Sequence, residues 1–436
     1  MFPETARLSQ FLGRLIHCGN SSGGIVVRAV LGLWLTVLVA WSEVPAADWP
    51  QWRGPARDGV ADASGVPAQW PARLVRAWSR KVGEGHSSPV VLSERVYQMS
   101  RDGGREVVRG LDLSTGRELW KSEYKAPYKV EPVARDHGPG PKSTPVVVGT
   151  RLVTFGISGI LSCWDTRSGR AVWSHEFGEQ HRLTAPLYGH SASPIVVDGR
   201  VIVHVGGHDD GALTAFDLAS GKVAWRWAGD GPAYASPVIV RLGGRLHLVT
   251  QSQKFHLGVD PATGTVLWRE SFSTQFDQNS VTPLVAGGRV ILGGYNQPTV
   301  SLELTGRGRR LKTDRMWKNR EISMYMSSPV LVGSHVFGLT HRRRGQLFCV
   351  DAMTGAVAWA TPGRLAENAS IVVAGRVLLV LTTDGNLLVV AAEGDSYKEL
   401  AKYRLSDSAT WAHPALVGSK LLVKNRETLQ VFDLAR

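Results

Sequence analysis

The sequence predicts an all-β protein, an eight-bladed β-propeller of four-stranded antiparallel blades. Three observations carry this prediction. A phrase of the form Asp, two residues, Thr or Ser, Gly, three residues, Trp occurs five times. Ser/Thr-Pro pairs recur ahead of apolar runs, and these runs are short, rich in Val, Ile and Leu, and bounded by Gly and Pro, as strands are. A self-similar unit of this length cannot bury its own apolar face, so copies must stack against one another.

The repeated phrase combines a turn with a packing residue. Its five copies are DLSTGRELW (112–120), DTRSGRAVW (165–173), DLASGKVAW (217–225), DPATGTVLW (260–268) and DAMTGAVAW (351–359). Asp and Ser/Thr side chains hydrogen-bond nearby backbone N–H groups in such turns, and Gly accepts a positive φ. The Trp should reach into the seam between adjacent sheets. We expect this docking role for seven tryptophans: Trp78, Trp120, Trp173, Trp225, Trp268, Trp317 and Trp359.

The number of blades follows from the first strands. Pro is tolerated at the head of a strand, where its missing N–H falls outside the ladder. Ser370 takes the same role by alignment, which makes eight first strands with the leading prolines Pro89, Pro145, Pro194, Pro237, Pro283, Pro329 and Pro414. Blades 5 and 7 depart from the pattern: blade 5 ends in GRGRRLKTDRMW (306–317), and Tyr403 stands where a Trp is expected in blade 7.

The two ends of the chain should meet in blade 8. The last copy, 413–434, stops after its third strand, and a strand with Trp78 lies at the other end, in RLVRAWSRKVG (73–83). We therefore expect the N-terminal strand to pair with the C-terminal three. Such closure removes the exposed edges that an open array would present.

The first part of the chain reads as a targeting segment. Residues 29–41, AVLGLWLTVLVAW, carry no charge, and the small residues of VPA (44–46) supply a cleavage site. A run of 13 residues is short for a membrane span, so the mature form should have none; an uncleaved signal anchor is the alternative. The expected organisation is a signal peptide at 1–46, an N-terminal extension at 47–72 and the propeller at 73–436, in a periplasmic or secreted protein.

Charge and cysteine content exclude several function classes. The formal net charge is +13, with basic clusters RGRRLK (307–312) and HRRRG (341–345). These turns should project from opposite faces, so they do not form one phosphate-binding surface, and no nucleic-acid partner is expected. They are either solvated tips or contacts to an anionic envelope surface. Cys163 and Cys349 share one repeat position and should be buried; no CxxC motif offers a metal cluster or vicinal disulfide.

Two long connections are candidate functional loops. They run from Trp120 to Pro145 and from Trp173 to Pro194, and should form a lip over one face. They contain four histidines: His137, His175, His181 and His190. No pair has the spacing of a known metal site, so no metal is expected.

A second candidate is the mouth of the central channel. The first strand of each blade is innermost, so residues three or four before its marker should ring the mouth. We expect binding contacts from eight residues: His86, Lys142, His190, Tyr234, Asn279, Tyr325, Glu367 and Trp411. The alternative is that strand-entry positions are polar simply because they are exposed.

The phrase also carries a family resemblance. GLDLSTGRELW (110–120) and AFDLASGKVAW (215–225) resemble the tryptophan-docking motif A-x-D-x-x-T-G-x-x-x-W of the pyrroloquinoline-quinone (PQQ)-like repeat. The resemblance extends from about residue 70 onward, and DWPQWRGPARDG (48–59) is similar to the mature start of many secreted bacterial proteins of this class. It implies one of two functions, a quinoprotein alcohol dehydrogenase or a non-enzymatic propeller similar to BamB. The motif is structural and favours neither.

The available side chains favour the second function. A quinoprotein dehydrogenase needs hard oxygen ligands for Ca²⁺, a carboxylate base and an aromatic ring that stacks on the quinone. The predicted mouth offers one carboxylate, Glu367, with Asn279 and Trp411 as further candidates under that alternative. No G-x-S-x-G, H-E-x-x-H or P-loop pattern occurs.

We therefore expect a secreted, monomeric, non-catalytic propeller that acts as a scaffold in the cell envelope. Its partner should be an envelope protein or a polysaccharide. No cofactor is expected; PQQ and calcium belong only to the alternative of a PQQ-dependent, alcohol dehydrogenase-like oxidoreductase. A second alternative is a carbohydrate-binding module that uses exposed Trp and Tyr side chains.

Overall fold

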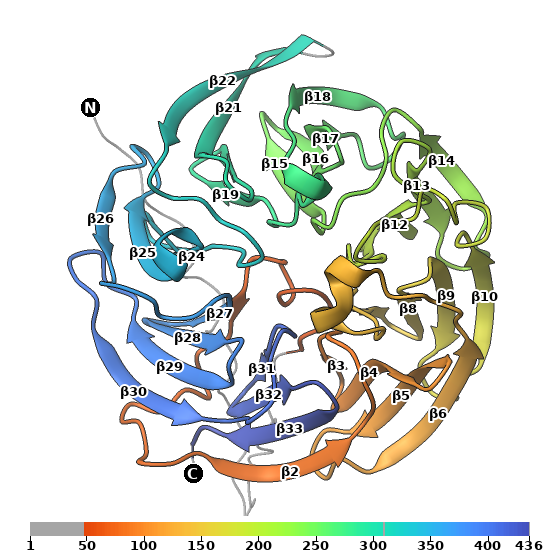
Figure 1. Ribbon diagram of the computed structural model, residues 1–436, viewed down its shortest axis with the longest axis horizontal. Coiled ribbons are helices and arrows are strands. Elements are labelled where there is room, and N and C mark those ends of the chain that lie inside the picture. The colour runs from red at the N-terminus through yellow and green to blue at the C-terminus, as the bar shows by residue number, and fades with distance from the viewer. Residues whose placement is uncertain (1–47, 308–309, 436) are drawn as a thin grey trace, which may run out of the picture. The chain divides into compact units, whose positions relative to one another are not determined.

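The computed structural model describes residues 48–307 and 310–435. The predicted signal peptide, 1–46, lies outside this part of the chain. Within residues 45–436, four-stranded antiparallel sheets surround a central axis, and the predicted eight-bladed propeller is confirmed (Figure 1). Among the described residues, no helix has the length and hydrophobicity that crossing a membrane requires.

Each blade is a meander whose first strand is innermost. Blades 1 and 2 contain β3 (Val90–Leu92), β4 (Arg95–Asp102), β5 (Arg105–Asp112), β6 (Glu118–Lys125), β7 (Val146–Val148), β8 (Arg151–Phe155), β9 (Ile160–Asp165) and β10 (Ala171–Glu176). Blades 3 and 4 contain β11 (Ile195–Val197), β12 (Arg200–Val205), β13 (Ala212–Asp217), β14 (Val223–Trp227), β15 (Val238–Leu242), β16 (Arg245–Gln251), β17 (Phe255–Val259) and β18 (Val266–Ser271).

The second half of the ring repeats this order. Blades 5 and 6 contain β19 (Leu284–Ala286), β20 (Arg289–Leu292), β21 (Thr299–Arg307), β22 (Arg310–Asn319), β23 (Val330–Val332), β24 (His335–Thr340), β25 (Gln346–Asp351) and β26 (Val357–Ala360). Blade 7 contains β27 (Ala369–Ala374), β28 (Val377–Thr382), β29 (Asn386–Ala391) and β30 (Glu399–Arg404), and the short β1 (Val60–Ala61) pairs in parallel with β27. Blade 8 contains β31 (Ala415–Val417), β32 (Lys420–Lys424), β33 (Thr428–Asp433) and β2 (Val75–Lys81). Three short 3-10 helices lie in connections: η1 (Pro132–His137), η2 (Gln275–Asp277) and η3 (Arg342–Arg344).

The ring closes in blade 8 as the sequence predicts. β2 pairs with β33 in antiparallel register, from Val75 opposite Asp433 to Lys81 opposite Thr428. The hydrophobic core is divided among the seams between blades; in one seam Leu161 of blade 2 packs with Val203 of blade 3. Because each seam buries the faces of two sheets, no blade is stable without its neighbours.

The motif tryptophans bridge these seams by a common hydrogen bond. The indole N–H of Trp120 donates to the carbonyl oxygen of Thr166, the residue after the motif Asp of the next blade, at 2.9 Å. The same bond joins Trp78 to Leu113, Trp173 to Leu218, Trp225 to Pro261 and Trp317 to Ala352. Trp359 donates to the carbonyl of Glu393 in blade 7.

The glycine of the motif is required by two constraints at once. Gly169 has φ +71°, and a Cβ there would lie 2.4 Å from the Trp120 ring. The turn that ends one strand pair is therefore also the surface on which the preceding blade's Trp packs. This coupling explains why Gly and Trp recur together in the phrase.

Blade 5 breaks the pattern for a visible reason. It lacks the Asp-x-x-Thr-Gly turn and has a long hairpin, β21–β22, in its place. Trp268 of blade 4 consequently has no such turn to meet, and its indole N–H lies 3.3 Å from Nδ1 of His247 in its own blade.

Blade 7 has Tyr403 in place of the docking Trp. The Tyr403 hydroxyl donates to the carbonyl oxygen of Pro71, at 2.7 Å.

Residues 48–59, the N-terminal plug, cross the middle of the ring (Figure 1). Trp49 exchanges two backbone hydrogen bonds with Val91 of blade 1. Arg57 donates to the carbonyl oxygens of Ser193 and Pro194 in blade 3, both at 3.0 Å. Arg53 donates to the carbonyl of Pro329 in blade 6. Because both guanidinium groups are buried and bind blades far apart in the ring, the plug connects the innermost strands across the channel.

Candidate functional site

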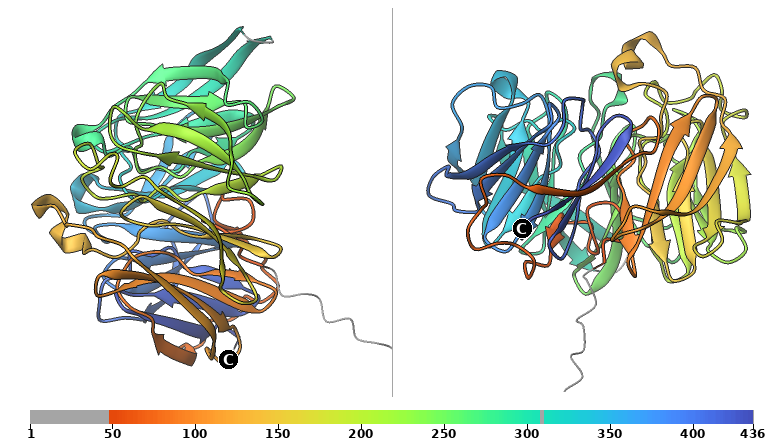
Figure 2. Two further views of the ribbon diagram at one scale, coloured as in Figure 1. Left: turned by 90° about the vertical axis from the view of Figure 1, so that its right-hand side faces the viewer. Right: turned by 90° about the horizontal axis from the view of Figure 1, so that it is seen from below.

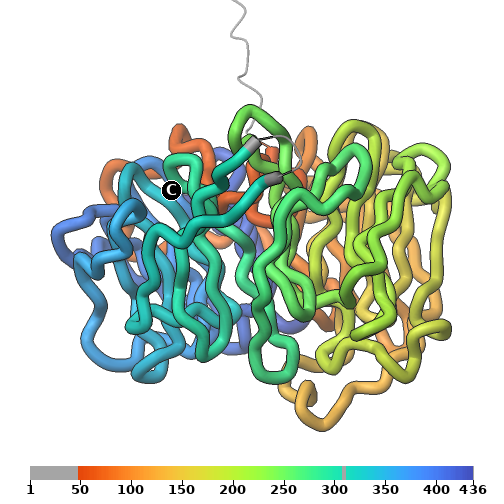
Figure 3. The backbone as a smooth tube through the Cα atoms, turned by 90° about the horizontal axis from the view of Figure 1, so that it is seen from above, coloured from red at the N-terminus to blue at the C-terminus, as the bar shows by residue number. Residues whose placement is uncertain are grey.

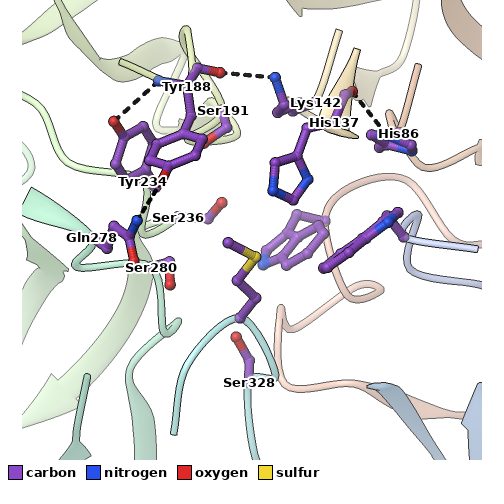
Figure 4. A pocket seen from close by; sticks show the side chains of 13 residues that line it. His86, His137, Lys142, Tyr188, Ser191, Tyr234, Ser236, Gln278, Ser280 and Ser328 are labelled. Atoms are coloured by element: carbon purple, nitrogen blue, oxygen red, sulfur yellow. Dashed lines mark hydrogen bonds between the residues drawn. The ribbon is translucent and has the colours of Figure 1, made fainter. Parts of the chain in front are cut away.

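The candidate site is a cavity of about 150 Å³ at one mouth of the channel, above the N-terminal plug (Figure 4). It lies where the connections between successive blades meet. Its aromatic and apolar lining consists of Trp52, His86, His137, Tyr188, Tyr234, Met326 and Trp411. Its polar lining consists of Lys142, Ser191, Ser236, Gln278, Ser280 and Ser328.

The structure brings four of the eight predicted mouth residues together. His86, Lys142, Tyr234 and Trp411 line this cavity. Glu367 is exposed in a neighbouring recess, which Trp411 also lines.

Tyr325 instead belongs to a ring cluster beside the cavity. Its ring centroid lies 4.6 Å from Tyr295 and 6.3 Å from His341.

His190 and Asn279 do not line the cavity, contrary to the predicted ring. His190 is buried against Phe155, with ring centroids 4.8 Å apart. Asn279 is fully buried, and its amide donates to the carbonyls of Ser252 and Gln253 at 2.7 and 3.0 Å. The reason is that the connections between blades differ in length and fold, so a fixed offset from the first strand does not select one facing direction.

Some lining residues were not predicted for the mouth. Trp52 belongs to the plug, and no local pattern marks it. His137 ends η1, and Tyr188 lies in the connection between blades 2 and 3. Both fall in the two long connections that the sequence singled out, and His137 was named there, but their place in the cavity depends on long-range packing. The serines had a local signal, because Ser236 and Ser328 directly precede the recurring prolines.

Hydroxyls before these prolines join neighbouring blades. The backbone N–H of Ser88 donates to Oγ1 of Thr144, that of Thr144 to Oγ of Ser193, and that of Ser193 to Oγ of Ser236. The N–H of Thr282 likewise donates to Oγ of Ser328. Trp52 of the plug donates its indole N–H to Oγ1 of Thr282, at 2.9 Å. The Ser/Thr-Pro pair therefore aligns the innermost strands and holds the floor of the cavity.

Positive charge dominates the cavity and the channel below it. Lys142 donates from Nζ to the carbonyl of Tyr188 at 2.8 Å, and burial lowers the pKa of its ammonium to about 8. Burial, followed by repulsion from Lys142, lowers the pKa of His86 to about 3, so this ring is neutral at pH 7. In the plug, burial lowers the pKa of Arg53 to about 10 and that of Arg57 to about 9.

This donor set does not fit a calcium–quinone pair. Ca²⁺ prefers several oxygen ligands including carboxylates, and the cavity lining among the described residues contains none. Asn279, the amide ligand suggested above, is occupied by backbone carbonyls and by the Thr274 hydroxyl.

The four histidines of the two long connections do not form one cluster, because each has a different environment. His175 bonds the carbonyl of Gly221, and His181 lies 2.9 Å from Asp210. His137 faces the cavity, whereas His190 is buried. No group of three metal-ligating side chains occurs among the described residues.

Comparison with known proteins places the fold and the family. The outer membrane protein assembly factor BamB of Yersinia pestis is 21% identical over 385 residues, which cover 80% of this chain and 86% of that protein. Quinohemoprotein alcohol dehydrogenase ADH-IIG of Pseudomonas putida is 29% identical over 167 residues, which cover 36% of this chain and only 21% of the dehydrogenase. The crystal structure of BamB from Moraxella catarrhalis has a TM-score of 0.61 at 18% identity, covering 83% of this chain and 98% of that chain.

At such identity, a structural likeness shows the shared fold alone. The family profile gives the stronger result, because it matches residues 104–361, more than half of the chain. The chain belongs to the family described as outer membrane protein assembly factor BamB.

Proposed function

We propose that this protein is a secreted, monomeric propeller that works in the cell envelope without catalysis or cofactor. It binds a protein partner through the face that carries the channel mouth, here called the mouth face. The observation that carries the proposal is the composition of the connections on this face. Val133, Leu183 and Phe276 lie in three of them and are 51%, 89% and 51% exposed. Exposed apolar side chains that share one face are typical of a protein interface.

The shape of the mouth face supports this proposal. The connection with η1, in yellow-orange, projects well beyond the sheets on one side of the ring (Figures 2 and 3). Val133 lies in η1 and is exposed, and the last residue of η1, His137, lines the cavity. Loops held by a rigid scaffold are the usual carriers of binding function.

Charge on the same face narrows the class of partner. η3 presents three exposed side chains, those of Arg342, Arg343 and Arg344. It follows directly after His341, whose ring centroid lies 4.9 Å from that of Tyr295. A partner with acidic side chains around an apolar centre would complement this surface. The similar proteins of Yersinia pestis and Moraxella catarrhalis are assembly factors or BamB by name, and a protein of outer-membrane assembly is the partner we propose.

Because one similar protein is a quinohemoprotein alcohol dehydrogenase, quinone-dependent alcohol oxidation is the alternative function that an experiment must exclude. Purified protein should be mixed with PQQ and Ca²⁺, then examined for quinone absorbance after gel filtration and for dye-linked alcohol oxidation. We expect neither retained quinone nor turnover, because the cavity offers one lysine and several hydroxyls in place of carboxylates. Stoichiometric quinone with turnover would overturn the proposal.

A further inference from the structure

The channel-mouth cavity is closed at its inner end. Trp52 forms part of its wall and is held by Thr282, at 2.9 Å. The next residue of the plug, Arg53, is buried, and its Nη2 donates to the carbonyl of Pro329. In the described part of the chain, the plug therefore occupies the inner end of the cavity, and a ligand that enters from the mouth face meets a fixed indole.

The walls fit a flat ring. The His137 ring lies edge-on to Trp411 at 5.0 Å and to Tyr188 at 5.8 Å, and Tyr188 lies edge-on to Tyr234 at 5.7 Å. In Figure 4 the His137 ring projects into the space opposite Tyr188 and Ser191. A volume of about 150 Å³ matches an apolar cavity known to accept benzene. The space suits one six-membered ring with a small substituent.

The charges around this space fit an anion. Lys142 is the cation of the lining, and no carboxylate lies among the thirteen lining residues in the described part of the chain. Arg53 and Arg57, buried in the channel beneath, add to the positive potential. An ammonium in a poorly hydrated site is stabilised by an anion at contact distance. A second buried polar atom, Nδ1 of His86, has no hydrogen-bond partner among the described residues and can bind the same ligand or its water.

We propose that this cavity binds one small aromatic carboxylate, its ring against the aromatic wall that His137, Tyr188 and Trp411 form and its carboxylate on Nζ of Lys142. The proposal goes beyond the scaffold role and does not depend on it, because it concerns a small molecule in the cavity and not a protein on the mouth face. A tricyclic quinone with several carboxylates is larger than the cavity and carries more negative charge than Lys142 can neutralise. Inorganic phosphate would leave the aromatic walls unused.

The proposal fixes the sign of the pH dependence. The carboxylate is ionised above its own pKa near 4, and Lys142 is charged below about pH 8. Affinity should therefore be constant near pH 7 and fall as pH rises through the lysine pKa. The other titratable groups that surround Lys142 are His86, His137, Tyr188 and Tyr234. Burial lowers the pKa of both histidines and raises that of both tyrosines, so none of them changes charge in this window.

Benzoate is the probe, and titration calorimetry with tryptophan fluorescence is the measurement. The neutral benzyl alcohol and the ringless acetate are matched ligands. We expect benzoate to bind one site and both matched ligands to bind at least about tenfold more weakly. Lys142→Met should weaken benzoate by at least about tenfold, whereas Lys222→Met, at an exposed turn of blade 3, should have no effect.

The fold of each variant must be measured separately from its affinity for benzoate. Lys142→Met also removes the bond to Tyr188, so circular dichroism and thermal unfolding must show a native fold. Ser191→Phe, which fills the cavity from its rim and leaves Lys142 in place, should abolish benzoate binding. Equal affinity for benzyl alcohol and benzoate, no benzoate binding at millimolar concentration, or unchanged binding in a folded Lys142→Met protein would each overturn the proposal.

Discussion

Acidification from about pH 7 to about pH 5 should destabilise the folded ring by several kcal/mol. Four of the buried histidines in the described part of the chain are neutral at pH 7: His190, His204, His256 and His413. Burial lowers the pKa of His204 to about 4 and that of the other three to about 3, from an ordinary value near 6.5. Each pKa is lower in the folded chain, so protons bind preferentially to the unfolded chain. The contribution of these neutral histidines to the free energy of unfolding is complete above about pH 6.5 and is lost as pH falls toward their pKa in the folded chain.

The magnitude follows from linkage. Each histidine contributes about 1.4 kcal/mol per pH unit between its unfolded and folded pKa. At about pH 5 this amounts to roughly 2 kcal/mol for each, and roughly 8 kcal/mol for all four if they act independently. Urea denaturation at several pH values measures it, and the denaturation midpoint should fall with each step below pH 6.5.

His256 offers the cleanest variant of this experiment. Its ring packs 3.8 Å from that of Phe272, and neither ring nitrogen has a hydrogen-bond partner among the described residues. His256→Leu should reduce the pH slope by about one proton, or about 1.4 kcal/mol per pH unit. Met353→Leu, at an exposed turn of blade 6, removes no titratable group; it is the control and should leave the slope unchanged. A midpoint that does not vary between pH 7 and 5 would contradict the account.

Loss of the closing strand should have the other large effect. β2 supplies all the backbone pairing of β33 on its outer side, and Trp78 docks on blade 1 through the carbonyl of Leu113, at 2.8 Å. Deletion of residues 73–83 should prevent formation of a stable ring, because it leaves an open edge and an uncovered seam. Trp78 is partly buried against this seam, so Trp78→Ala should lower the free energy of unfolding by about 3 kcal/mol, the lower end of the range for tryptophans in packed cores.

The same strand supplies a control. Val75 is 43% exposed, and Val75→Ala should change stability by less than about 0.5 kcal/mol. If Trp78→Ala were as mild as Val75→Ala, blade 8 would not depend on this seam. A monomeric, cooperatively folded protein without residues 73–83 would refute the closure.

The parts of this molecule that repeat could be predicted from its sequence. A turn that must hold Asp, Thr or Ser and Gly also receives the Trp of the preceding blade, so local chemistry and long-range packing appear in one phrase. Asp112 shows the local part, since its Oδ1 accepts from the N–H of Thr115 at 2.8 Å. Strand pairing and ring closure follow once the phrase is counted.

The parts that occur once could not be predicted in this way. Arginines are rarely buried, so nothing in residues 48–59 indicated that Arg53 and Arg57 would occupy the channel. His190 and Asn279 share their sequence offset with residues of the mouth. They turn inward because their connections fold differently, which only the packed structure shows.

Face-resolved crosslinking tests the central claim most directly. A photoreactive phenylalanine analogue should replace Val133, Leu183 or Phe276 on the mouth face, and Val148 or Met353 on the opposite face, all of them exposed. Irradiation in living cells, followed by affinity purification and mass spectrometry, identifies the neighbours. The account predicts that the three mouth-face positions crosslink to one and the same envelope protein and that Val148 and Met353 do not. Crosslinks of equal yield from both faces, or none from the mouth face, would contradict it.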